Sequence, residues 1–66
     1  MRELKANQII RDAAMRKGVF LYQVGERFGY KYPEQWSRRL RTELSQEDQE
    51  KALRCIDQIV REREQA

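Results

Sequence analysis

The sequence predicts a single all-α domain that is built from four helices and spans residues 1–66. Apolar side chains recur at helical spacing in four stretches, no stretch shows a strand signal, and no Gly- or Ser-rich linker divides the chain. A chain of 66 residues forms one domain and buries only about 60% of the surface that its unfolded form exposes. We therefore expect a small core.

The first helix is expected from about Asn7 to Lys17, where pairs of isoleucine and alanine recur at helical spacing. Gly18 follows at the place where a helix end favours a residue that tolerates left-handed geometry. Residues 1–6 have few apolar members and either extend this helix or form a frayed arm. We favour a short extension.

The second helix is predicted over roughly Leu21 to Phe28, and Gly29 ends it. Gly25 lies in its middle, where glycine costs about 1 kcal/mol relative to alanine. Close approach of another helix backbone would offset this cost.

The third helix is predicted from about Pro33 to Glu43, because proline suits the first position of a helix. Trp36, Leu40 and Leu44 form its inward stripe. Tyr30, in the preceding turn, is also assigned to the core.

The fourth helix is predicted from about Gln46 to Arg63, with Ser45 as its cap and acidic residues in its first turn. Its broad apolar face is wide enough to cover the first and third helices, and Cys55 at the border of this face is a packing residue.

Charge is distributed unevenly along the chain. Residues 16–42 hold seven basic and two acidic side chains, whereas residues 43–66 hold four basic and seven acidic ones. Positive charge concentrated in the middle of the sequence is expected if one surface contacts phosphates while the C-terminal residues face water or another protein.

Several other classes are disfavoured by composition. The chain has no histidine and one cysteine, so we expect no metal, no cofactor and no internal disulfide. It lacks a long apolar run and a segment like a signal peptide, so we expect no membrane partner and a cytoplasmic location. Scattered carboxylates and the absence of a phosphate-cradling glycine loop argue against an enzyme.

Residues 21–44 form the one segment whose spacing and chemistry together indicate a partner, because they read as a helix-turn-helix that binds DNA. Glycines allow the crossing and the turn, and Trp36 and Leu40 fix the third helix. Gln35 and Arg38 lie one turn apart on its outward side, where they suit adenine and guanine edges respectively.

The pattern Val24-Gly25-x-x-x-Gly29 resembles the helix-turn-helix of the Cro and lambda-repressor superfamily. Segments 18–24 and 36–44 are similar to a group of short bacterial proteins of this superfamily that are common in Gram-positive genomes and mobile elements. The resemblance covers about residues 7–62 and implies a lambda-repressor-like fold and a transcriptional regulator of bacterial or mobile-element origin.

The resemblance also implies roles for individual residues. Gln23 would contact a phosphate, and Gln35, Arg38 and Thr42 would face the major groove. The turn is one residue longer than in the commonest pattern of the superfamily, so the register of these contacts is open by about one residue.

The remaining cations of the motif are expected to contact phosphates, namely Lys31, Arg39 and Arg41. Arg39 has an alternative partner in Glu43, four residues on. We expect a homodimer on paired half-sites, with the fourth helix as its interface. The rival hypothesis is a protein-interaction adaptor that docks an acidic partner through Tyr22, Tyr32 and the arginines, and Glu34 slightly favours it.

Overall fold

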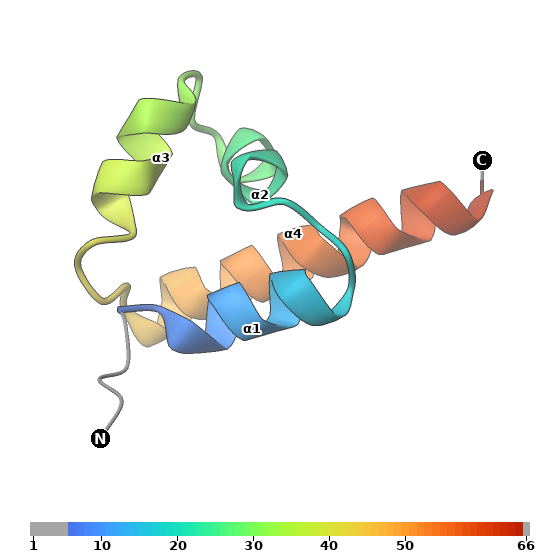
Figure 1. The fold of residues 1–66 in the computed structure, drawn as a ribbon, viewed down its shortest axis with the longest axis horizontal. Coiled ribbons are helices and arrows are strands. Elements are labelled where there is room, and N and C mark those ends of the chain that lie inside the picture. Colours follow the sequence, from blue (N-terminus) through green and yellow to red (C-terminus); the bar gives the residue numbers. More distant parts are fainter. Residues whose placement is uncertain (1–5, 66) are drawn as a thin grey trace.

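The computed structural model of the protein describes residues 6–65, which form four α-helices and no strand (Figure 1). The helices are α1 (Gln8–Arg16), α2 (Leu21–Phe28), α3 (Pro33–Arg39) and α4 (Gln46–Gln65). The predicted all-α class is confirmed, and the bounds of α2 are those expected from the sequence. Within the described part of the chain, no helix is both long and apolar enough to cross a membrane.

The longest helix, α4, is the platform for α1 and α2, and α3 packs in turn on α2. Figure 1 shows α1 running alongside α4, with α2 and α3 stacked over this pair. The expectation that the last helix covers the first and third is therefore wrong for the third, because α2 takes that place. The inward stripe of α3 contains Trp36, which packs against α2 instead.

The core is one cluster to which every helix contributes. Its buried apolar members are Ile10, Ala14, Val19, Val24, Trp36, Leu40, Leu44, Ala52, Cys55, Ile56 and Ile59. Four of these belong to α4, whose apolar face is thus covered by the chain itself. The buried residues of α4 are thus occupied within the chain, and the homodimer expected through this helix stays a prediction.

Local signals set most of the helix ends. Gly18 and Gly29 have φ values of +67° and +120°, which side chains disfavour, and they follow α1 and α2 as expected. Ser45 caps α4 by accepting a hydrogen bond from the Asp48 amide at 3.2 Å. Asn7 has φ +61°, and Ala6 and Asn7 lie in a turn, so the favoured extension of α1 is wrong at Ala6, while residues 1–5 lie outside the described residues.

The third helix ends earlier than the sequence predicts, at Arg39 rather than near Glu43. The amides of Arg41 and Thr42 bond to the carbonyls three residues before them, which tightens the chain into a turn. Leu40 and Leu44 are still buried, so the burial of the inward stripe is confirmed although both residues lie beyond the end of α3.

Gly25 is buried at the contact between α2 and α3. A Cβ atom at this position would lie 2.5 Å from Cγ and 2.7 Å from Cδ1 of Trp36. A close neighbour was expected here, but it is the indole ring and not a helix backbone. The ring centroids of Phe28 and Tyr30 lie 5.1 and 5.4 Å from the ring centroid of Trp36. Tyr30 therefore packs on the core as predicted.

Candidate nucleic-acid interface

The residues expected to read bases all lie at the surface of the third helix and the turn after it. Gln35 and Arg38 are exposed on α3, one turn apart. Thr42 is also exposed, but it lies beyond the end of the helix and its carbonyl is bound by Asn7. Its side chain therefore does not follow the helical register that places the other two together.

The cations of this region differ in whether they have a counter-charge. Lys31, Arg38 and Arg41 are exposed and form no ion pair with any acidic side chain of residues 6–65. By contrast, Lys17 pairs with Asp57 and Arg27 pairs with Glu62. Three unpaired cations thus lie on α3, the turn before it and the turn after it. Further exposed cations without an ion pair among residues 6–65 include Arg16, Lys51, Arg54 and Arg61.

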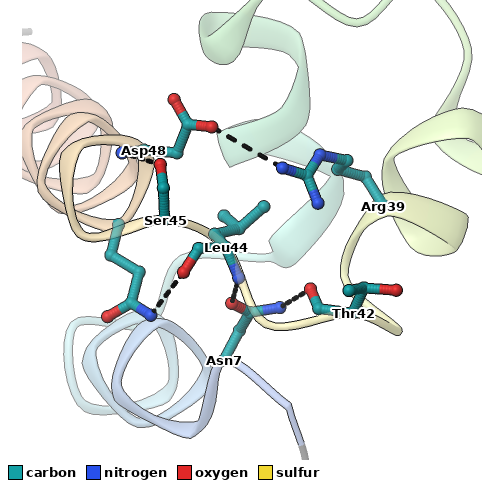
Figure 2. A network of polar contacts seen from close by, with 7 residues as sticks. Asn7, Arg39, Thr42, Leu44, Ser45 and Asp48 are labelled. Atoms are coloured by element: carbon teal, nitrogen blue, oxygen red, sulfur yellow. Dashed lines mark hydrogen bonds and ion pairs between the residues drawn. The ribbon is translucent and has the colours of Figure 1, made fainter.

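Arg39 differs from its two neighbours. It is half-buried, and its Nη2 atom lies 3.6 Å from Oδ2 of Asp48 at the start of α4 (Figure 2). The prediction that Arg39 pairs with Glu43 is wrong. Its carboxylate instead accepts hydrogen bonds from the Asn7 amide and from Nε2 of Gln49.

Gln23, which the resemblance assigns to a phosphate contact, lies in the first turn of α2. Its Oε1 accepts from the Phe20 amide at 3.0 Å and from Nη2 of Arg63 at 3.4 Å. The first bond satisfies one of the free amides at the helix start. With the oxygen of the side chain occupied in this way, its amide nitrogen is the atom left to donate to an anion.

Asn7 is a residue that sequence reasoning missed. It is fully buried, and its Nδ2 donates to the carbonyls of Leu40 and Thr42 at 2.9 and 3.0 Å. Its Oδ1 accepts from the Leu44 amide at 2.8 Å. Figure 2 shows this side chain reaching from the start of α1 into the loop between α3 and α4. An asparagine before a helix signals a cap, and no local pattern reveals a bond to residues more than 30 positions away.

Aromatic and acidic side chains are also exposed on α2 and α3 and just before them. Phe20 and Tyr22 stack with ring centroids 5.7 Å apart, Phe20 being largely exposed and Tyr22 half exposed. Tyr32 is half exposed, with Nζ of Lys31 5.6 Å from the centre of its ring. Glu34, also exposed, adds one negative charge to the first turn of α3.

The single cysteine takes no part in this surface. Cys55 is buried on α4, and its burial raises the pKa of the thiol despite the nearby positive charge of Lys51. A raised pKa disfavours the thiolate, which is the nucleophilic form. This agrees with the packing role predicted for it.

No protein-family model, no curated protein and no solved structure matches this chain. A function for it must therefore be argued from the surface just described.

Proposed function

We propose that this protein is a transcriptional regulator of bacterial or mobile-element origin that binds double-stranded DNA in a sequence-specific manner. The main observation in favour is the set of unpaired, exposed cations, Lys31, Arg38 and Arg41, gathered on one helix and its two flanking turns. Exposed cations without counter-charges suit phosphates, since each such contact releases counterions from the duplex.

The roles of the side chains follow from what each can reach. Gln35 and Arg38 would contact base edges, and Thr42 would do so from the turn at the end of α3. Lys31, Arg41 and the amide nitrogen of Gln23 would contact phosphates. Arg39 would do so only by giving up its pair with Asp48, a loss that is small for half-exposed groups.

A salt titration with a duplex of random sequence tests the proposal. Two phosphates neutralised by Lys31 and Arg41 predict a log–log slope of about −1.8, which is a loss of about 12-fold between 50 and 200 mM salt. A homodimer would double the slope to about −3.6. R41A should reduce the steepness by about 0.9 per subunit, whereas R27A, whose arginine is paired with Glu62, should leave it unchanged. No binding at low salt would refute the proposal.

Sequence specificity needs a separate test. R38A should relax discrimination at one base pair by about 1–3 kcal/mol, whereas K31A should weaken all duplexes alike. Selection of bound duplexes from a random pool gives the site, and a palindromic result supports the homodimer.

The second candidate function is a protein-interaction adaptor, which the exposed, stacked pair Phe20 and Tyr22 favours. An adaptor would bind an acidic protein through these rings together with Tyr32 and the arginines. A steep salt dependence with duplex DNA, together with the base-specific effect of R38A, would exclude it as the main function.

A further inference from the structure

Asn7 is built into the loop after α3 and not into its own helix. At the residue before a helix, an asparagine side chain ordinarily accepts from an amide of the first turn, but Asn7 makes no such bond. Its backbone has the left-handed φ of +61°, and its side chain is completely buried. All three of its side-chain hydrogen bonds go to residues 40, 42 and 44, and Figure 2 shows the two to Thr42 and Leu44.

These bonds fix the exit of the third helix. The helix ends at Arg39, and in the turn after it the side-chain amide of Asn7 donates to the carbonyls of Leu40 and Thr42. Arg41 lies between the two anchored carbonyls, so its backbone is held on both sides. One turn of chain links it to Arg38, because the Arg41 amide donates to the Arg38 carbonyl at 3.2 Å.

The backbone of Asn7 also affects the charge of this surface. Its amide donates to Oε2 of Glu43 at 2.9 Å, and Nε2 of Gln49 binds the other carboxylate oxygen at 2.8 Å. The carboxylate adjacent in sequence to Thr42 is therefore tied to the start of α1 and to α4. A phosphate near Arg41 would otherwise meet this negative charge in an unrestrained position.

We propose that Asn7 is a positioning residue of the DNA-binding surface, which sets the placement of Arg41 and Thr42 relative to Arg38. The inference rests on the function proposed above. It adds that contacts at the end of α3 depend on the start of α1, whereas contacts at the turn before α3 do not.

A double-mutant cycle in duplex affinity tests the proposal. N7G is the suitable variant, because glycine accepts the left-handed backbone and keeps the amide that binds Glu43. The affinity of the double variant N7G/R41A should differ by about fivefold or more from the value obtained by multiplying the effects of the two single variants. The effects of N7G and K31A should multiply to within about twofold, because Lys31 lies at the other end of α3.

The control separates positioning from stability. The control is I59A or I59V, whichever has the same unfolding midpoint as N7G. Either variant removes buried apolar atoms of α4 and leaves the loop after α3 unchanged, so it should bind DNA like the original chain. If N7G is unfolded at the assay temperature, N7D takes its place, since it keeps the acceptor for the Leu44 amide and loses both donors.

The outcomes also separate this inference from the proposed function. Additive effects for N7G and R41A, in a chain that binds duplex DNA with the expected salt slope, would overturn the role of Asn7 alone. Equal coupling of N7G to R41A and to K31A would do the same, since it would mean a general structural effect. Absence of DNA binding by the original chain would overturn the proposed function and this inference with it.

Discussion

Replacing Gly25 by alanine tests the packing that holds α3 in place. The added Cβ would lie 2.5, 2.7 and 2.9 Å from three carbon atoms of Trp36, distances at which something must move. The indole is only 1% exposed and is flanked by the rings of Phe28 and Tyr30, which limits the directions in which it can yield.

Two opposing effects decide the magnitude. Overpacking of a well-packed core costs typically about 1–3 kcal/mol, and three contacts below 3.0 Å place this site at the upper end. Alanine in the middle of a helix recovers about 1 kcal/mol relative to glycine. The net loss in the free energy of unfolding is therefore about 2 kcal/mol, out of roughly 3–10 kcal/mol for a chain of this length.

Thermal and urea unfolding, followed by far-ultraviolet circular dichroism, measure this loss. A domain of this size loses about 4–8 °C per kcal/mol, so Tm should fall by about 8–16 °C. G29A is a comparison with a different cause, because its Cβ meets nothing within 4 Å and its loss comes only from a φ of +120°. A G25A variant as stable as the original chain would refute the argument that the indole excludes a side chain here.

Two further predictions concern the fourth helix. S45A removes the hydroxyl that accepts from the Asp48 amide and should cost about 1 kcal/mol in urea unfolding, and an unchanged midpoint would mean that this cap contributes nothing. The hydrogen bond and charge of Lys17 lower the pKa of Asp57, so the stability that Asp57 contributes is present above its ordinary pKa and is lost as the pH falls through the lowered value. D57N should therefore lose less stability than the original chain below about pH 4, and parallel pH profiles for the two would contradict this.

Much of the fold could be predicted because its signals are local. The stops at Gly18 and Gly29, the cap at Ser45 and the bounds of α2 each depend on residues within a few positions of one another. The burial of Trp36, Leu40 and Leu44 was likewise predicted from their spacing, although only Trp36 lies within α3.

The errors arose where distant segments meet. The early end of α3 lies next to the turn in which the Asn7 side chain binds carbonyls 33 and 35 residues away. Arg39 finds its counter-charge in Asp48, nine positions on and in another helix, and not at the helical spacing of Glu43. Periodicity gives the face of a residue but not its partner across a loop, so the exposed cations of the candidate site were predictable and the pairing of Arg39 was not.

The surroundings of Trp36 make this chain its own optical reporter. It is the single tryptophan of the sequence and is buried on α3 against α2. Its Nε1 has no hydrogen-bond partner among residues 6–65. An indole in such dry surroundings emits at short wavelength, and its emission moves to longer wavelength once water reaches it. The fluorescence of the unlabelled protein thus reports separation of α2 from α3 specifically, so loosening at this junction can be told apart from melting of α4.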